Sequence, residues 1–281
     1  MRQIHCDTII ESVRQIALKA AFDLPPDVLR RLEAIHAEED SAIGKRILNQ
    51  ILENADIAAK EKLPICQDTG TAVLFVQIGN DVAITGGVLP EALNEGVRRG
   101  YNEGYLRKSI VADPLFNRAN TKDNTPASIH YDFVAGDKLA ITILPKGGGC
   151  ENMSNLAMLK PSDGKEGIIE FVVSSIVKAG GNPCPPVIVG IGIGGTADKA
   201  CCLAKKALLR PVGSMHADKK YADFENELLS HINNSGVGPQ GFGGHSTALA
   251  AHIETAPCHI ASMPVALSLN CHAARNASVT I

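Results

Sequence analysis

The stretch Pro64-Ile65-Cys66-Gln67-Asp68-Thr69-Gly70-Thr71 stands between a helical pattern and a strand-like run, and the rest of the chain is organised around it. It carries a thiol, an amide, a carboxylate and two hydroxyls within eight residues. The apolar run Ala72–Ile78 predicts a strand after it, so the stretch itself is predicted to be a bend. Polar bends between regular elements often carry chemistry. The alternative is a buried cysteine with Asp68 capping a turn, and these eight residues alone do not decide between the two.

The composition is that of a globular protein with one large or two ordinary domains. The chain has 281 residues, of which 45% are apolar and 20% charged, and its formal net charge is −3. A nearly neutral chain with no Trp and few aromatic residues is a poor candidate for binding nucleic acid or an anionic membrane. The most apolar run, residues 185–195, is too short to span a bilayer, and no signal-peptide pattern opens the chain. We therefore expect a cytoplasmic protein with neither nucleic acid nor membrane as a partner.

Helical patterns fill the first part of the chain. Thr8-x-x-Glu11 is typical of a capping box, Pro25-Pro26 of a second helix start, and Ser41 can cap a third helix. Helices first, with mixed strands and helices afterwards, predict an α+β fold. We expect a single domain over residues 1–281, with a helical N-terminal region at 1–62 and an α/β region at 63–281.

Beyond the opening stretch, the sequence predicts two β-hairpins and a buried strand. The hairpins are expected at residues 73–84, around Gly79-Asn80-Asp81, and at residues 128–144, around Ala135-Gly136-Asp137. Residues 185–193 are almost wholly apolar, which predicts a strand that is buried on both faces.

The chain contains eight cysteines and no Cys-x-x-Cys pair. Cysteines spread along a cytoplasmic chain are not expected in disulfides, and the missing short spacing counts against a zinc ribbon or a cluster with locally spaced ligands. Cys66, Cys184 and Cys271 each lie in a predicted bend beside a regular element, where a thiolate can project from a rigid scaffold. Three thiolates from distant loops can hold three corners of a cubane iron–sulfur cluster and leave the fourth iron open. The alternative is three ordinary buried cysteines.

Other polar residues offer weaker signals. Lys146 and the triglycine Gly147-Gly148-Gly149 can present backbone N–H groups to an anion, or can form a flexible exit from a strand. Arg107, Arg118 and Arg275 are candidate clamps for a carboxylate. Any one of these arginines, taken alone, is better explained as a solvated surface residue.

Taken together, motifs along the chain resemble those of the iron–sulfur fumarases. The likeness is to the N-terminal part of class I fumarate hydratase, or to the α subunit of its two-chain form, and it runs from about the second predicted helix to the C-terminus. Its motifs are Ile65–Thr71, Leu106-Arg107, Asn124-Thr125-Pro126-Ala127, Lys146-Gly147-Gly148-Gly149, Asn182-Pro183-Cys184-Pro185-Pro186, Gly194-Gly195-Thr196 and Cys271-His272-Ala273-Ala274-Arg275-Asn276.

The resemblance implies a 4Fe–4S cluster in which one iron is not ligated by cysteine. The cluster ligands of the family fall on Cys66, Cys184 and Cys271. Its substrate-binding positions fall on Gln67, Asp68, Arg107 and Gly149. Asp68 is implied as the general acid that protonates the departing hydroxyl, a role that suits a carboxylate beside a metal-bound hydroxyl.

The implied reaction is the reversible hydration of fumarate to L-malate, a hydro-lyase step of the tricarboxylic acid cycle. Because the sequence ends at Ile281, shortly after the last cysteine motif, we expect the family's smaller C-terminal domain on a separate β subunit. That subunit would supply the general base and further basic residues, and the assembly is expected to be a heterotetramer. One departure is Cys150, which stands where some relatives carry serine and is not assigned to the cluster.

Three alternatives stay open. An L(+)-tartrate dehydratase α subunit would share the cluster and the scaffold. A non-catalytic Fe–S subunit would have no need of Gln67, Asp68 and Arg107. A thiol-nucleophile enzyme would need a thiolate–histidine pair, and the adjacent Cys-His pairs at 258–259 and 271–272 are poorly placed because neighbours on a strand face opposite sides.

Overall fold

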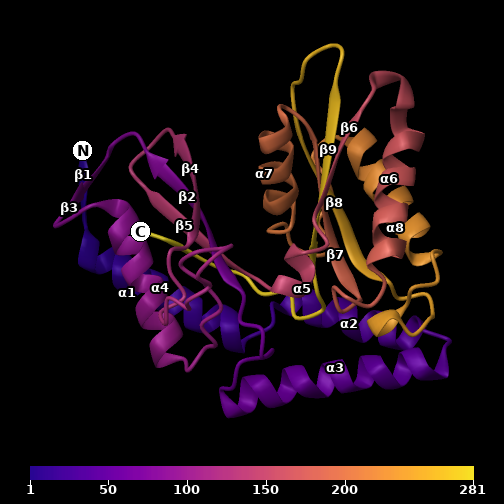
Figure 1. Ribbon diagram of the computed structural model, residues 1–281, viewed down its shortest axis with the longest axis horizontal. Helices are drawn as coiled ribbons and strands as arrows, with labels where there is room; N and C mark the ends of the chain where they lie inside the picture. Colours follow the sequence, from indigo (N-terminus) through magenta and orange to yellow (C-terminus); the bar gives the residue numbers. More distant parts are fainter. The chain divides into compact units, whose positions relative to one another are not determined.

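The computed structural model describes residues 1–281, which form two compact units. Unit 1 comprises Met1–Leu24, Ala55–Gly148 and Arg275–Ile281, and unit 2 comprises Pro25–Asn54 and Gly149–Ala274. Each unit contains its own helices and strands (Figure 1), so the predicted α+β class is confirmed. The region 1–62 is shared between the units. No helix of the chain is both long enough and apolar enough to span a bilayer.

Unit 1 is built on a four-stranded sheet with the order β10-β5-β2-β4. Its strands are β2 (Thr71–Gly79), β4 (Ser128–Val134), β5 (Leu139–Lys146) and β10 (Ala277–Thr280). The apolar strand β2 runs antiparallel to β5 and parallel to β4. A second, two-stranded sheet pairs β1 (Arg2–His5) with β3 (Val82–Thr85) in parallel. Because β2 begins at Thr71, the sheet holds the preceding bend, residues 66–70, at one of its ends.

Two helices, α1 (Cys6–Phe22) and α4 (Leu89–Glu103), pack against each other and share the core of unit 1 with the four-stranded sheet. Glycines of α4 allow this close approach. A Cβ atom on Gly96 would lie 2.5 Å from the Cβ of Val13, and one on Gly100 would lie 2.8 Å from the Cβ of Ala17. Any side chain at these two positions would therefore push the helices apart.

The starts of the N-terminal helices differ in part from the predictions. The predicted capping box at residues 8–11 is not formed. Helix α1 begins earlier, at Cys6, and its N-cap is His5, whose side chain accepts a hydrogen bond from the N–H of Asp7. Strand β1 ends at His5 and so determines where the helix begins. The prediction for Ser41 is confirmed: its hydroxyl accepts a hydrogen bond from the N–H of Gly44 at the start of α3 (Ala42–Glu61). Helix α2 spans Pro26–Glu38, as its prolines indicate.

Both predicted hairpins are wrong, although their strands exist. Strand β3 pairs with β1 and not with β2, whereas β4 and β5 pair with opposite sides of β2 and not with each other. A strand such as β2, apolar along most of its length, needs a neighbour on each side to satisfy its backbone. That neighbour can come from any part of the chain, so a turn between two strands does not make them partners.

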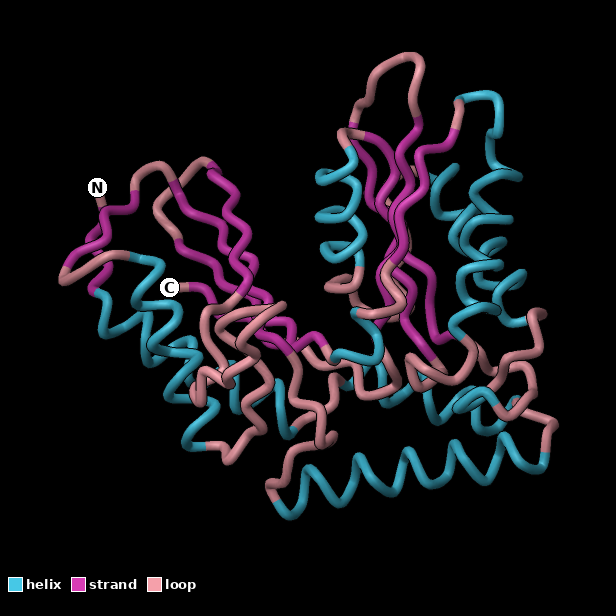
Figure 2. Tube along the Cα trace, in the orientation of Figure 1, coloured by secondary structure: helices cyan, strands magenta, loops and turns pink.

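Unit 2 has three layers around a second sheet, with the order β6-β9-β7-β8. The strands are β6 (Asn155–Leu159), β7 (Val187–Gly194), β8 (Ala248–Ala256) and β9 (Met263–Asn270). Helix α7 (Ala197–Ala207) covers one face, and α6 (Gly164–Ala179) and α8 (Lys219–Asn233) cover the other (Figure 1, Figure 2). Every residue of β7 is buried, which confirms the strand predicted at residues 185–193.

A histidine in the core of unit 2 links stability to pH. His252, on β8, is only 2% exposed. Burial, together with the charge of the nearby Arg210, lowers the pKa of His252 to about 4 from its ordinary value of 6.5. The folded chain therefore keeps this imidazole neutral at pH values where the unfolded chain binds a proton.

We expect the contribution of His252 to the free energy of unfolding to be complete above pH 6.5. This contribution should fall by about 3 kcal/mol as the pH drops toward about 4. The sign follows because the unfolded state binds the additional proton across that range. Urea unfolding near pH 7 and near pH 5 measures the fall. A His252→Gln chain is the control and should lose this part of the pH dependence; equal pH slopes in the two chains would contradict the prediction.

Candidate active site

The bend at residues 66–70 is a tightly packed part of unit 1. Its entrance is held by a hydrogen bond of 3.0 Å from the N–H of Ile65 to the carbonyl of Ala21. At its exit, Gly70 has a φ of +75°, and a Cβ there would lie 2.7 Å from the backbone of Lys146. Only glycine combines this left-handed conformation with so close a backbone approach. The glycine thus lets β5 and the bend meet without a gap.

The Asp68 carboxylate is fixed by two backbone donors. Its Oδ1 accepts a hydrogen bond of 3.1 Å from the N–H of Gly70, and its Oδ2 accepts one of 2.7 Å from the N–H of Gly148. The triglycine does direct a backbone N–H at an anion, and that anion is the Asp68 side chain. Each carboxylate oxygen has two lone pairs, so both oxygens keep acceptor capacity for a proton or a ligand.

Two polar side chains from elsewhere in unit 1, Tyr101 and Asn124, hold the backbone of the bend, and one side chain of the bend itself, Thr69, bonds outward. The hydroxyl of Tyr101, a residue only 1% exposed, donates to the carbonyls of Thr69 at 2.8 Å and Gly70 at 3.2 Å. Burial raises the pKa of this phenol, so Tyr101 stays a donor. The Thr69 hydroxyl donates to the carbonyl of Arg107 at 2.7 Å, and Asn124 Nδ2 donates to the carbonyl of Gly70 at 3.1 Å. These bonds tie the bend to the motifs at residues 106–107 and 124–127.

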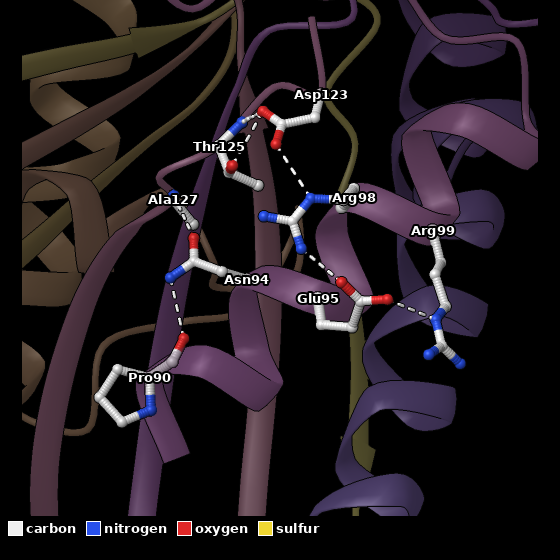
Figure 3. Close-up of polar contacts among 8 residues, drawn as sticks. All are labelled: Pro90, Asn94, Glu95, Arg98, Arg99, Asp123, Thr125 and Ala127. Carbon is white, nitrogen blue, oxygen red and sulfur yellow. Dashed lines mark hydrogen bonds and ion pairs between the residues drawn. The ribbon is translucent and has the colours of Figure 1, made fainter. Parts of the chain in front are cut away.

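Helix α4 positions the motif at residues 124–127 (Figure 3). The Arg98 side chain binds an oxygen of Asp123 at 2.9 Å, and the other Asp123 oxygen accepts from the N–H and the hydroxyl of Thr125 at 3.0 and 2.8 Å. Burial alone would raise the pKa of Asp123, but the bonds from Thr125 and Arg98 outweigh it and lower the pKa to about 2. Asn94, on the same helix, accepts a hydrogen bond from the last N–H of the motif.

The remaining substrate positions predicted from the sequence are open to solvent. The side chains of Gln67 and Arg107 belong to exposed residues of unit 1 and form no hydrogen bond with the rest of the chain. Gly149 is exposed in unit 2, and a Cβ there would lie 2.9 Å from the carbonyl oxygen of Asn182. An exposed guanidinium, an amide and a bare backbone can each bind a carboxylate or a hydroxyl of a small ligand.

Donors outside the loop stabilise the segment that carries Cys184. Its three prolines have no N–H, so the loop Asn182-Pro183-Cys184-Pro185-Pro186 can form few hydrogen bonds of its own. The carbonyl of Pro185 accepts from both the backbone N–H and the side-chain Nε2 of Gln240, at 2.8 and 2.9 Å. The carbonyl of Pro183 accepts from the Cys150 thiol at 3.3 Å. Cys184 itself is exposed and has a φ of +54°, which its surroundings must stabilise. Cys150 is thus a brace for this loop.

Cys184 and Cys271 lie on adjoining loops of unit 2. Cys184 precedes β7, Cys271 follows β9, and these two strands are antiparallel neighbours, so the start of one meets the end of the other. The N–H of His272 donates to the carbonyl of Cys184 at 3.4 Å. The sequence separates these cysteines by most of unit 2, and only the sheet topology brings them together.

The three predicted cluster cysteines are divided between the units. Cys66 belongs to unit 1, and Cys184 and Cys271 belong to unit 2. No cysteine is in a disulfide, and no group of three or more His, Cys, Asp or Glu side chains is gathered to hold a metal ion. All three cysteines are half-buried or exposed thiols on braced loops, and soft thiolates of this kind suit iron–sulfur ligation. The donor chemistry therefore fits the implied cluster.

Two arginines that the sequence offers as equal candidates for a carboxylate clamp differ in their burial. Arg118 is exposed and donates to the carbonyl of Pro114, so it is a surface residue. Arg275 is 3% exposed, and its Nη2 donates to the carbonyl of Asp68 at 2.7 Å. The alternative of a solvated surface residue is therefore wrong for Arg275. Its position in the motif after Cys271 was the signal that could have singled it out.

Proteins of known name are similar to this chain over almost its whole length. The sequence model of the family described as "Fumarate hydratase (Fumerase)" matches residues 10–280. A Methanocaldococcus jannaschii protein named "Putative L(+)-tartrate dehydratase subunit alpha" is 46% identical over 277 residues, which are 96% of this chain and 95% of that one. The "L(+)-tartrate dehydratase subunit alpha" of Escherichia coli strain UTI89 is 34% identical over 284 residues, covering 100% of this chain and 93% of its own. The chain therefore belongs to the fumarate hydratase (Fumerase) family.

Proposed function

We propose that this chain is the α subunit of a heteromeric hydro-lyase that interconverts fumarate and L-malate. The observation that carries the proposal is the Asp68 carboxylate, fixed by two backbone N–H groups in a bend that also bears the exposed Gln67. Membership of the fumarate hydratase family supports the class of reaction. The names of the relatives, which are those of α subunits, support a heteromeric enzyme.

The residues of the site suit the steps of a water elimination. Arg107 offers a planar fork for one carboxylate of the substrate, while Gln67 and the backbone of Gly149 offer further hydrogen bonds. Asp68 gives its proton to the substrate hydroxyl as the C–O bond breaks, and the hydroxyl leaves as water. A base on the partner subunit takes the proton from C3, and the electron pair of that C–H bond becomes the double bond.

Cys66, Cys184 and Cys271 would hold a 4Fe–4S cluster in this proposal. When bound, the cluster supplies Lewis acidity toward the substrate from an iron that no cysteine ligates. The chain's own contribution is to hold the thiols on braced loops and to place Asp68 two residues after the first of them. A β subunit would complete the site with its base and further cationic residues, and we propose a heterotetramer in the cytoplasm.

L(+)-tartrate dehydration is the second candidate, because the relatives at 46% and 34% identity carry that name. Both reactions remove water from a four-carbon 2-hydroxy dicarboxylate, so the same acid and the same clamps would serve. The complex isolated through a tag on this chain decides between them by kcat/KM for L-malate and for L(+)-tartrate. A higher value for L-malate supports the first candidate, a higher value for tartrate supports the second, and no turnover of either acid contradicts both.

Iron and acid-labile sulfide, measured on protein isolated without oxygen, test the cluster. We expect about four irons and four sulfides per chain in the wild type and in Cys201→Ser, and loss of both in Cys184→Ser. Cys201 is the matched control, because it is an exposed cysteine on α7 outside the proposed ligand set. A wild-type complex that takes up no iron after incubation with ferrous iron and sulfide contradicts the cluster.

A further inference from the structure

Unit 1 contains a small hairpin at residues 110–121. The N–H of Ala112 donates to the carbonyl of Ala119 at 2.9 Å. The N–H of Thr121 donates to the carbonyl of Ile110 at 2.9 Å. An antiparallel bridge lies between these two bonds. The segment is therefore an ordered element of unit 1.

The tip of this hairpin exposes two adjacent large apolar side chains. Leu115 is 69% exposed and Phe116 is 89% exposed. The turn that bears them is tied together, because Arg118 donates to the carbonyl of Pro114. Apolar groups held in water on an ordered turn gain nothing from burial within the chain, but they lose little conformational entropy when a partner covers them. The tip therefore has the properties of a preformed contact for another protein.

The two ends of the hairpin are joined to the active-site bend. The Thr69 hydroxyl donates to the carbonyl of Arg107 at 2.7 Å, and the Asn124 amide donates to the carbonyl of Gly70 at 3.1 Å. The amide oxygen of Asn124 accepts from the N–H of Ser109 at 2.8 Å, which links one end of the hairpin to the other. An extended chain spans about 3.4 Å per residue, so the apolar tip lies within about 20 Å of Ser109.

The β subunit of the proposed enzyme is the partner that fits this position. The residue that removes the C3 proton has to come within hydrogen-bond reach of a substrate bound at Asp68 and Arg107. A β subunit that places its base there covers the surface around Arg107 and so lies beside the hairpin. A second copy of this chain on the tip would instead occupy the approach to the site that the β subunit needs.

Another exposed aromatic residue of unit 1 lies in a different place. Phe133, on β4, is 79% exposed and is the register partner of Ile78. Because the bend precedes Thr71 at the start of β2, Ile78 lies near the opposite end of that strand. Exposure alone therefore does not single out the hairpin; its connection to the bend does.

We propose that the hairpin at residues 110–121 is the element by which unit 1 binds the β subunit, with Leu115 and Phe116 as its anchors. This inference rests on the proposed function, which supplies the partner and its base. A few large side chains, aromatic ones above all, carry most of the binding energy of a typical interface. The hairpin governs assembly and takes no part in the chemistry.

The double variant Leu115→Ser/Phe116→Ser tests the anchors in the complex isolated through a tag on this chain. Sedimentation velocity over a dilution series gives the Kd of assembly, and we expect the variant to raise it at least about tenfold. Assembled complex should keep its kcat for L-malate within about twofold of the wild type. The urea midpoint of the chain alone should not change, because both side chains are already in water. Phe133→Ser is the matched control and should alter none of these values.

Photochemical cross-linking identifies what the tip contacts. Phe116 is replaced by benzoylphenylalanine in the complex, and the product is weighed by mass spectrometry after irradiation. We expect a product with the summed mass of this chain and the β chain. The same replacement at Phe133 should give no such product.

Each other outcome has its own meaning. An unchanged Kd in the double variant overturns the inference, and so does a cross-link to a second copy of this chain, a cross-link within the chain, or none. A lowered urea midpoint would assign the two side chains to folding, against the proposal. A normal Kd with a raised KM would make the hairpin a lid over the substrate, also against it. A wild-type complex that turns over neither L-malate nor L(+)-tartrate contradicts the proposed function, whereas Kd and cross-links are measured without turnover, so the two failures are separable.

Discussion

Replacement of Asp68 by Asn is expected to lower kcat by about 10²- to 10⁴-fold, the contribution typical of a general acid. Asn has nearly the same shape but no proton to deliver to the departing hydroxyl. Its amide also offers one acceptor oxygen where the carboxylate offers two, so either Gly70 or Gly148 loses its partner. We therefore expect a smaller rise in KM beside the large fall in kcat, measured as conversion of L-malate to fumarate by the isolated complex.

The iron content of Asp68→Asn has to match the wild type for this result to concern catalysis. Asp113→Asn is the control for lost backbone contacts, because the Asp113 carboxylate likewise accepts backbone N–H groups, from Leu115, Phe116 and Asn117, in an exposed loop. It should leave kcat within about twofold of the wild type, as expected of a group that takes no part in proton transfer. Unchanged turnover in Asp68→Asn would remove the proposed acid role.

The largest expected effect on stability comes from Glu225, on α8 of unit 2. This residue is 5% exposed; its Oε1 accepts from Arg210 and from the N–H of Ile253 at 2.7 Å, and its Oε2 accepts from Arg210 at 3.3 Å. Glu225→Gln leaves the Arg210 charge without its partner and turns an NH₂ group toward a donor. We expect the free energy of unfolding in urea near pH 7 to fall by about 3–5 kcal/mol.

A second ion pair on the same helix provides the matched control for Glu225. Lys219 and Asp223 are paired at 2.9 Å, and both side chains are largely in water. Asp223→Asn is expected to change the free energy of unfolding by less than about 0.5 kcal/mol, because solvent screens an exposed pair. A Glu225→Gln chain destabilised no more than Asp223→Asn would show that the buried pair contributes no more than a surface one.

The outline of the fold follows from local patterns. Alternation and helical periodicity, with Gly and Pro as breaks, located the N-terminal helices, the strands β2, β3, β4 and β5, and the wholly buried β7. Local patterns do not predict which strands pair with each other. The turns at residues 79–81 and 135–137 connect strands that are not neighbours, because β2 takes its partners from elsewhere. The short strands β1, β6 and β10 were not predicted, since their stability comes from the strands beside them.

For the candidate site, too, some features follow from the sequence and others only from the tertiary structure. The sequence by itself determined the residue types: the thiols, the Gln67-Asp68 pair, the triglycine and the family to which their order belongs. Only the tertiary structure decided that Gly148 donates to Asp68, that β7 and β9 bring Cys184 beside the loop of Cys271, and that Arg275 is buried while Arg118 is not. Residue type is a local property of the chain. Burial and hydrogen-bond partners depend on segments 80 or more residues apart, which meet only when the sheets form.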